Sequence, residues 1–489
     1  MPQETPLPRR LLDLSCFSDT VRQIQLCISS PNDQGRYAAL SYCWGYSQPV
    51  VTTHENLSQY LLAIQFDSLP QTLQDAVKTT KAIGLSYLWI DALCIIQDSE
   101  LDKQREIANM AKIYQNASCT LVAACTTSSA EGFLEVRDGT PPALEIPVGC
   151  DSGELGTLSL LPTYQSPRFE ALHARAWTLQ EIILSPRLLI FGKDCVGWKC
   201  TAADYGMYRW TDWNGYCAER GLTTIRVGPD GEIIRPRISV YSPEVHTYRS
   251  SQQAERLPQL FRIWKDLIKD YSTRSMTNEE DKLNAIAGIV TYFQEQMNDV
   301  YLAGLWKKHL LYELSWYIEG ANRPSSKRAP SWSWMALEGP ISFQYDLCGW
   351  YTPIATVISC SVNQVALSAP FSKVAGGTLI LSGRFGSLPS RTRVCSSAYK
   401  YRWDMIADNV QRVWTDCEVN GLSGFEYFGL ATCVMETADG QDDGERSTWG
   451  LILKRIPDCH PQNPVYERVG WFNSSYWKAS HSRSEVTIV

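Results

Sequence analysis

The first 200 residues alternate between short apolar runs and longer segments with helical spacing. Apolar runs typical of buried strands occupy residues 37–42, 87–96 and 119–125. Between them, residues 69–84 and 98–116 place apolar side chains at intervals of three and four, which predicts amphipathic helices. The order strand–helix–strand–helix–strand predicts an α/β fold with an open, mostly parallel sheet flanked by helices.

The pattern changes twice further along the chain. Residues 201–340 are predicted to be a mostly helical extension. From residue 341 onward the pattern becomes rich in β-strands, and glycine- and serine-bearing turns separate strand-like runs such as 377–382 and 449–453. We therefore predict three domains, which are an α/β domain over 1–200, the helical extension and a β-rich domain over 341–489.

Composition excludes some classes of function. Hydrophobic residues make up 44% of the chain, which is enough for a sizeable core. The net charge of −7 argues against nucleic acid as a partner, because nucleic-acid-binding domains are usually basic. No run reaches the 18 or more apolar residues of a membrane helix, and the N-terminus lacks the apolar core of a signal peptide. We therefore expect a cytoplasmic protein that does not bind membranes.

The cysteines give little support for a metal site. In a reducing compartment the sixteen cysteines are expected to be free thiols, and none are spaced as CxxC. We therefore predict no metal site and no required cofactor.

Two of the predicted strands bring chemically useful side chains to one edge of the sheet. Ligands of open parallel sheets bind just beyond the carboxyl ends of the strands. The first strand leads into a set of polar and aromatic residues closed by a glycine, namely Ser41, Tyr42, Cys43, Trp44 and Gly45. The second run carries Asp91 and Cys94. An unpaired carboxylate in a buried strand is costly, so Asp91 is expected to have a partner. Either Asp91 is part of a binding site, or its role is structural, in which case it caps a neighbouring helix or pairs with a cation such as Arg175.

A third candidate stretch is Arg175-Ala176-Trp177-Thr178-Leu179-Gln180-Glu181. On a helix, Trp177 and Glu181 share one face. An aromatic ring beside a carboxylate can hold a flat or cationic ligand and act on its sugar, as in glycosidic cleavage. The alternative is a structural tryptophan beside a solvated glutamate.

Nucleophilic catalysis has weaker support. Cys43 needs an activating base, and the spacing links it to neither His54 nor His173. Ser41 lacks the GxSxG context of a nucleophile elbow, and no glycine-rich phosphate loop is present. Cys43, Cys94 and His173 therefore rank below the two carboxylates, Asp91 and Glu181, as candidates.

Taken together, three blocks resemble a known family. They are YAALSYCWG (37–45), the stretch from LPQTLQDAV to SCTLVAA (69–124) and RAWTLQEIILSPRLLIFG (175–192), and they are similar to the fungal heterokaryon-incompatibility (HET) domain. The later runs DKLNAIAGI (281–289), YLAGLW (301–306) and RAPSWSWMALEG (328–339) resemble the region that follows this domain in stand-alone members. The resemblance implies a fungal protein of self/non-self recognition and programmed cell death.

The HET family is in turn distantly similar to Toll-type (TIR) domains, some of which cleave NAD. This similarity implies a TIR-like or flavodoxin-like sheet, with Ser41 and Tyr42 at the end of its first strand. It also implies that Glu181 is catalytic, because the catalytic glutamate of TIR domains follows a tryptophan in a W-C-x-x-E pattern. The W-T-L-Q-E of this chain lacks the cysteine of that pattern.

Three hypotheses for the function follow. In the first, the protein is a NAD glycohydrolase in which NAD is the substrate. Glu181 then engages the ribose, Trp44 or Trp177 stacks on nicotinamide, and Arg175 meets a phosphate. In the second, a secondary-metabolite tailoring enzyme binds another small molecule at the same edge, with Asp91, Glu181 and His173 as acid/base groups. In the third, the chain is a non-enzymatic signalling module that binds a protein partner or self-associates.

Overall fold

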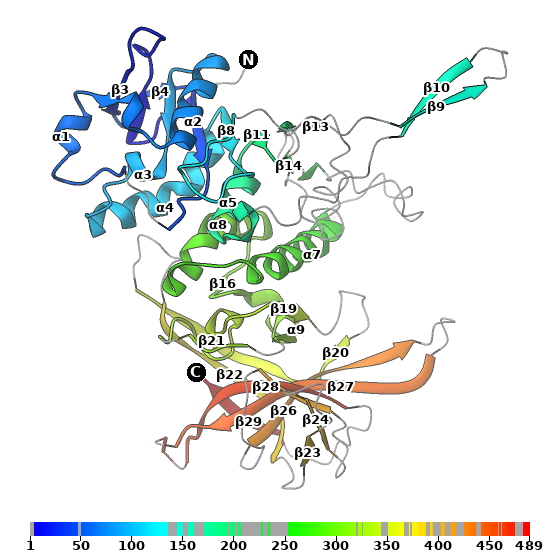
Figure 1. Cartoon of the computed structure of the whole chain (residues 1–489). Helices are drawn as coiled ribbons and strands as arrows, with labels where there is room; N and C mark the ends of the chain where they lie inside the picture. Colours follow the sequence, from blue (N-terminus) through cyan, green and yellow to red (C-terminus); the bar gives the residue numbers. More distant parts are fainter. Residues whose placement is uncertain are drawn as a thin grey trace. The chain divides into compact units, whose positions relative to one another are not determined.

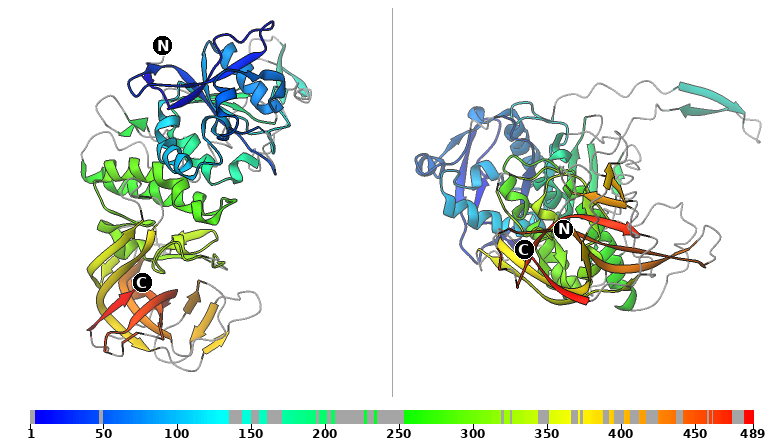
Figure 2. Two further views of the ribbon diagram at one scale, coloured as in Figure 1. Left: turned by 90° about the vertical axis from the view of Figure 1, so that its left-hand side faces the viewer. Right: turned by 90° about the horizontal axis from the view of Figure 1, so that it is seen from below.

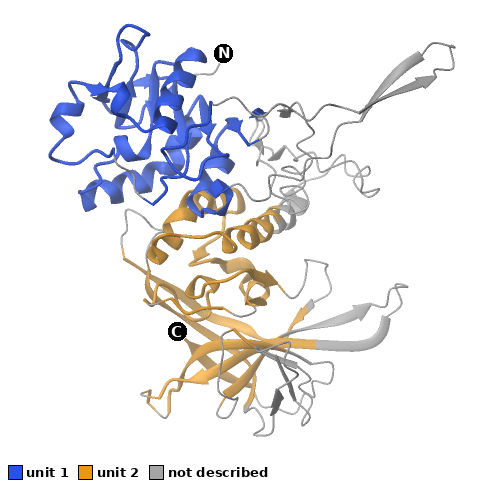
Figure 3. Ribbon diagram, in the orientation of Figure 1, with its two compact units in different colours: residues 1–245 blue, residues 246–489 orange. Residues whose placement is uncertain are grey.

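A computed structural model of the chain describes residues 4–46, 50–134, 171–193 and 253–318, and much of the remainder in shorter stretches that are mainly strands. The chain divides into two compact units, residues 1–245 and 246–489 (Figure 3). The predicted boundaries at 200 and 340 stay predictions, and residues 207–225 and 235–252 of the predicted helical extension lie outside the described residues.

Unit 1 is built around a sheet that has nine strands among the described residues (Figure 1). In spatial order they are β13 (Asp204–Gly206), β12 (Val196–Cys200), β11 (Arg187–Phe191), β8 (Cys119–Val122), β5 (Tyr37–Ser41), β7 (Tyr87–Trp89), β2 (Arg10–Asp13), β3 (Gln23–Ile28) and β6 (Ile64–Gln65). The four central strands β11, β8, β5 and β7 are parallel. The strands on both sides of them pair antiparallel.

The mixed α/β architecture confirms the predicted class, but the prediction of a mostly parallel sheet was wrong. The N-terminal strands β2 and β3 add an antiparallel pair beside β7, and β12 and β13 add another beyond β11. The apolar run 87–96 also differs from its prediction as one strand. It forms β7 and then a helical turn, α3 (Asp91–Cys94). Residues 92–94 of this turn are fully buried, so burial alone explains the apolar run.

Helices join the parallel strands as predicted. Helix α2 (Gln71–Ala82) begins directly after Pro70 and buries Leu73, Ala76 and Val77. Helix α4 (Glu100–Asn116) begins at Ser99, whose hydroxyl accepts a hydrogen bond from the Asp102 backbone N–H. Helix α5 (Trp177–Leu184) lies beside α4. Shorter helical pieces are α1 (Leu57–Tyr60), η1 (Phe66–Ser68) and η2 (Ala171–Ala174).

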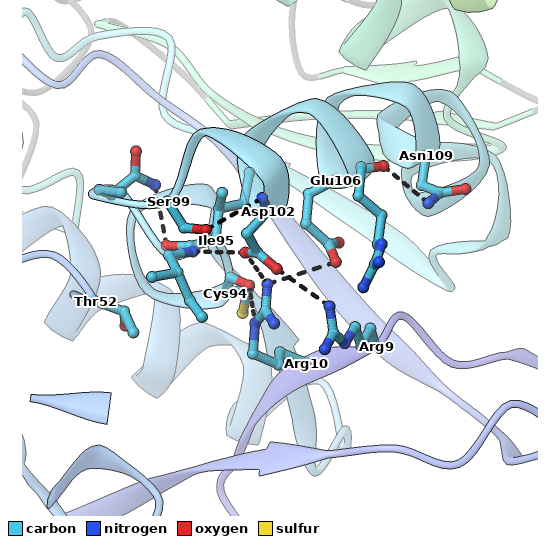
Figure 4. A network of polar contacts seen from close by, with 12 residues as sticks. Arg9, Arg10, Thr52, Cys94, Ile95, Ser99, Asp102, Glu106 and Asn109 are labelled. Carbon is cyan, nitrogen blue, oxygen red and sulfur yellow. Dashed lines mark hydrogen bonds and ion pairs between the residues drawn. The ribbon is translucent and has the colours of Figure 1, made fainter. Parts of the chain in front are cut away.

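A buried ion network connects β2 to α3 and α4 (Figure 4). The Arg10 side chain is 2% exposed, and its Nε donates to the carbonyl of Cys94 at 2.6 Å. Its Nη2 pairs with Asp102 and lies 3.5 Å from a Glu106 oxygen. Burial raises the pKa of Glu106, although the Arg10 charge opposes this shift. Arg9, which is 46% exposed, reaches Asp102 from outside at 3.2 Å.

Unit 2 begins with the helices α7 (Gln253–Ser272) and α8 (Ala287–Met297). A tight hairpin of β16 (Tyr301–Leu302) and β17 (Leu305–Trp306) follows, and then the short helix α9 (Leu310–Glu313). Strand β18 (Trp316–Ile318) pairs with β19 (Ile341–Phe343). Short 3-10 turns connect these elements, namely η4 (Glu279–Lys282), η5 (Asn284–Ile286), η6 (Lys307–His309) and η7 (Trp334–Ala336).

The C-terminal part of unit 2 is a ten-stranded sheet within the described residues (Figures 1 and 2). Its strands are β20 (Tyr351–Pro353), β21 (Thr356–Gln364), β22 (Val374–Ser387), β23 (Thr392–Val394), β24 (Arg402–Met405), β25 (Arg412–Thr415), β26 (Phe425–Glu436), β27 (Asp442–Arg455), β28 (Val465–Ser474) and β29 (Arg483–Ile488). All pairs are antiparallel except β28 with β29. Strands β22 and β27 contain the runs 377–382 and 449–453, so the β-rich prediction is confirmed.

Isolated two-stranded pairs complete the description: β1 (Thr5–Pro6) with β4 (Gln34–Gly35), β9 (Leu144–Gly149) with β10 (Leu155–Leu160), and β14 (Arg226–Val227) with β15 (Ile233–Ile234). No helix in the described ranges combines the length and apolarity needed to cross a bilayer. The same residues contain no group of three or more His, Cys, Asp or Glu side chains arranged to hold a metal ion.

Candidate functional site

Three elements of unit 1 meet beyond the carboxyl ends of the central parallel strands. Strand β5 ends at Ser41, helix α3 begins with Asp91 directly after β7, and helix α5 carries Glu181. Residues that are 140 positions apart in sequence are therefore in direct contact. We predicted from the sequence that ligands bind at this strand edge. The edge contains two carboxyl groups, Asp91 and Glu181, and both accept hydrogen bonds from neighbouring side chains.

The buried floor of this cluster is the pair Ser41 and Glu181. The Ser41 hydroxyl donates to Glu181 Oε2 at 2.5 Å, and the two residues are 1% and 7% exposed. Burial raises the pKa of Glu181 to about 7. The Ser41 hydrogen bond and the charge of Arg175 oppose this shift, whereas the nearby Asp91 adds to it. Glu181 therefore changes its charge close to neutral pH.

The outer layer contains Asp91 and Trp44, which are both half-buried. The Trp44 indole N–H donates to Asp91 Oδ2 at 2.9 Å, and the Ala92 backbone N–H donates to Oδ1 at 2.7 Å. Burial raises the pKa of Asp91, and the Arg175 charge and these hydrogen bonds act against that rise. Asp91 thus fixes the plane of the Trp44 ring at the strand edge.

Arg175 is the cation of the cluster. It lies between η2 and α5, and its Nη1 donates to the carbonyl of Tyr42 at 2.6 Å. Burial opposes its charge, but Glu181, Cys43 and Asp91 together hold the pKa of Arg175 above its ordinary value. The Arg175 charge lowers the pKa of both carboxyl groups, Asp91 and Glu181, against the effect of their burial.

Cys43 and Cys94, the lower-ranked candidates, lack the environment that activates a cysteine nucleophile. Cys43 is 5% exposed, and burial raises the pKa of its thiol despite the nearby Arg175. Cys94 is fully buried in the main core beside Arg10, and burial also raises its pKa. A nucleophilic cysteine needs a lowered pKa, so both thiols fit packing roles.

The remaining candidates lie close to the cluster in the chain. His173 is on η2, two residues before Arg175. Trp177 is the first residue of α5, and it packs against the main core of unit 1 while staying half-buried. Trp177 and Glu181 are on one helix, as the sequence predicted.

Sequence reasoning missed one member of the cluster, Tyr114 on α4. It is 1% exposed, and its hydroxyl donates to the carbonyl of Leu40 at 3.0 Å. The Tyr114 side chain also interacts with the Glu181 carboxyl, and this interaction lowers the pKa of Glu181. The sequence signal was a tyrosine on the apolar face of α4, where leucine or phenylalanine would pack without a polar atom that needs a partner.

Gly45 closes the strand end and is required there for two reasons. Its φ of +81° is unfavourable for other residues, and a Cβ at this position would lie 2.8 Å from Ser128 Oγ and 2.9 Å from Ser128 Cβ. Gly84, at the end of α2, has a similar φ of +77° with nothing within 4 Å of such a Cβ. A side chain at Gly84 would meet backbone strain alone, whereas a side chain at Gly45 would meet backbone strain and steric overlap with Ser128.

We expect Gly84→Ala to lower the free energy of unfolding by about 1 kcal/mol through strain alone. Gly45→Ala should cost about 1–3 kcal/mol more, because Ser128 must move. Urea denaturation of the full chain measures both values. Equal losses in the two variants would show that the 127–129 segment does not pack against Gly45 as described.

Comparison with known protein families finds a match for the segment that contains this cluster. Residues 37–181 match the family model described as Heterokaryon incompatibility protein (HET). The match begins at the first residue of β5 and ends at Glu181, so it includes all the residues of the cluster. No curated protein and no solved structure matches the chain.

Proposed function

Because residues 37–181 match the heterokaryon incompatibility (HET) family model, we propose that this segment is a HET domain that hydrolyses the N-glycosidic bond of NAD with Glu181 as its reacting carboxylate. NAD loss would then be the route to cell death in fungal self/non-self recognition. The TIR-like character of the sheet is part of this proposal. The observation that carries it is a buried glutamate, hydrogen-bonded to Ser41 at the carboxyl edge of parallel strands, where burial raises its pKa to about 7.

The reaction breaks the bond between C1′ of the nicotinamide ribose and N1 of the pyridinium ring. Both bonding electrons go to N1, so nicotinamide leaves as a neutral molecule and needs no general acid. Water adds to C1′ and loses one proton, which gives nicotinamide, ADP-ribose and H⁺. In its ionised form Glu181 stabilises the positive charge that develops on the ribose and accepts the proton of the attacking water.

The neighbouring side chains support these steps. The Ser41 hydrogen bond favours the charged form of Glu181, and the Arg175 charge acts in the same direction. Trp44, fixed by Asp91, offers a ring of defined orientation on which nicotinamide can stack. The contact of Arg175 with a phosphate, expected from the sequence, remains a prediction.

A second candidate function is non-enzymatic signalling, and one observation favours it. Trp44 and Trp177 pack against the main core, and the polar atoms of Asp91 and Glu181 are engaged within the domain. Such a cluster also serves as a rigid scaffold for an interaction surface. A scaffold releases no nicotinamide, so one assay separates the two functions.

The experiment is release of nicotinamide from NAD by the full chain, measured by chromatography from pH 5.5 to pH 9. The wild-type rate should rise with pH and level off above the pKa of Glu181. Ser41→Ala removes a hydrogen bond that favours the carboxylate, so the midpoint of the profile should move up by about one pH unit. An active Ser41→Ala variant with an unchanged midpoint would contradict the role of Ser41, and no release by the wild type at high protein concentration would contradict the proposed function.

A further inference from the structure

The loop that follows strand β8 brings a third strand end to the candidate site. We call residues 123–134 the β8 loop. Because β8 is parallel to β5 and pairs with it, this loop leaves the sheet at the same edge. The Ser129 backbone N–H donates to the carbonyl of Trp44 at 3.4 Å, and the Ser128 side chain packs against Gly45. The β8 loop therefore supports the backbone that carries the Trp44 ring.

The side chain of Asp75 on α2 holds the far end of this loop. Asp75 is 1% exposed, and its Oδ2 accepts hydrogen bonds from the backbone N–H groups of Phe133 and Leu134 at 2.8 and 3.0 Å. Its Oδ1 accepts a hydrogen bond from the Gln71 side chain at 2.8 Å. Hydrogen bonds from backbone N–H groups to a carboxylate are charge-assisted and strong, so Asp75 fixes the backbone of the loop.

A second residue of α2 binds the middle of the loop. Thr72 is in the first turn of α2, where backbone N–H groups have no partner inside the helix. Its N–H donates to the carbonyl of Ser129 at 2.9 Å, and its hydroxyl accepts from the Gly132 N–H at 3.1 Å. The β8 loop is therefore bound to α2 along its length, from Asp75 to the residue that contacts Trp44.

We propose that Asp75 is a positioning residue of the candidate site, because it holds the β8 loop against the backbone of Trp44. Asp91 binds the indole N–H of Trp44, so the backbone and the ring of this residue are both held. Without Asp75, the loop no longer supports the Trp44 backbone, and the ring loses its fixed orientation at the strand edge. NAD is then bound less tightly, although Glu181 and Ser41 stay in place. This consequence for NAD rests on the proposed function, whereas the placement of Trp44 does not.

The orientation of Trp44 can be measured without NAD, by fluorine NMR of the full chain labelled with fluorotryptophan. The Trp44→Phe variant identifies the Trp44 signal among those of the seventeen tryptophans. Asp75→Ala should shift this signal. Asp75→Asn should largely restore it, because the amide oxygen can still accept from the Phe133 and Leu134 N–H groups. An unchanged Trp44 signal in folded Asp75→Ala would overturn the proposal.

Two glycines provide a test from the loop side of the contact. Gly132 and Gly84 have the same φ of +77°, so alanine meets the same backbone strain at both positions. A Cβ on Gly132 would lie 2.6 Å from Gln71 Cγ and 2.9 Å from Asp75 Oδ2, whereas nothing lies within 4 Å of a Cβ on Gly84. Gly132→Ala should therefore shift the Trp44 signal, and Gly84→Ala should leave it unchanged. The same response in both variants would contradict the proposal, even if Asp75→Ala does not fold.

The kinetics of nicotinamide release measure the consequence for NAD. Asp75→Ala should raise KM by about three- to tenfold, which corresponds to the loss of one ordered aromatic stack. It should change kcat little, because the Glu181 carboxylate is untouched. A fall in kcat with an unchanged KM would overturn the positioning role. If the wild type releases no nicotinamide, the proposed function fails, and the fluorine signals still decide whether Asp75 positions Trp44.

Discussion

Glu181→Gln is expected to lower the rate of nicotinamide release by at least about 100-fold at pH 8, where the wild-type carboxylate is ionised. Glutamine keeps the size of the side chain and can still accept the Ser41 hydrogen bond. It cannot carry the negative charge that stabilises the ribose cation or accept the proton of water. The loss should therefore fall on kcat, with little change in the affinity for NAD.

A matched control is Glu106→Gln, which changes another buried glutamate of the same domain whose pKa is also raised. Glu106 interacts with Arg10 and Asp102, away from the Ser41 cluster. Its replacement should leave nicotinamide release unchanged at temperatures where the protein is folded. Equal losses in both variants would assign the effect to stability, and full activity of Glu181→Gln would exclude Glu181 as the reacting group.

The pH dependence of stability gives a second test of the same residue. Folding raises the pKa of Glu181 from its ordinary value to about 7, so the folded state disfavours the ionised form. The resulting cost is absent in acid, grows as the pH rises from the unfolded pKa, and is complete above pH 7. Glu181→Gln removes this cost, so it should be at least as stable as the wild type at pH 8. Urea denaturation at pH 5 and pH 8 measures the difference.

The largest loss of stability is expected from Arg10→Ala. This change leaves Glu106 buried without its arginine partner and leaves Asp102 with only the exposed Arg9, which costs about 3–5 kcal/mol of unfolding free energy. Arg9→Ala is the control, since Arg9 contacts the same carboxylate from an exposed position and should cost less than about 1 kcal/mol. Comparing the two variants therefore measures a buried and an exposed ion pair that share the Asp102 carboxylate.

The physical cause can be checked by repeating the urea denaturation in acid. Burial already raises the pKa of Glu106, so at low pH this carboxyl is protonated in the variant and its charge no longer needs Arg10. The gap between Arg10→Ala and the wild type should narrow as the pH falls. Similar losses from Arg9→Ala and Arg10→Ala, or a gap independent of pH, would show that the network does not act through buried charge.

The sequence predicted the central part of unit 1 well because its signals are local. Strand β5, helix α2, helix α4 and strand β8 each have a period and boundaries that neighbouring residues determine. Strand β2 was not predicted, since it is four residues long and contains the buried charge of Arg10. Arg10 on this strand is paired with Asp102 and Glu106, which lie more than 90 residues further along the chain.

The candidate site shows the same limit. Local sequence placed Ser41 at a strand end and put Trp177 and Glu181 on one helix. It placed Asp91 on a strand, although Asp91 begins the helical turn α3, because an apolar run does not distinguish a buried strand from a buried helical turn. Tyr114 joined the site through tertiary packing alone.

The central claim is that NAD binds at the strand edge with its ribose facing Glu181. A crystal structure of the Glu181→Gln full chain soaked with NAD tests it most directly, because this variant should bind the substrate without consuming it. The predicted result is nicotinamide stacked on Trp44, with C1′ of its ribose beside residue 181 and close to Ser41. NAD bound elsewhere, or no NAD bound at millimolar concentration, would contradict the account.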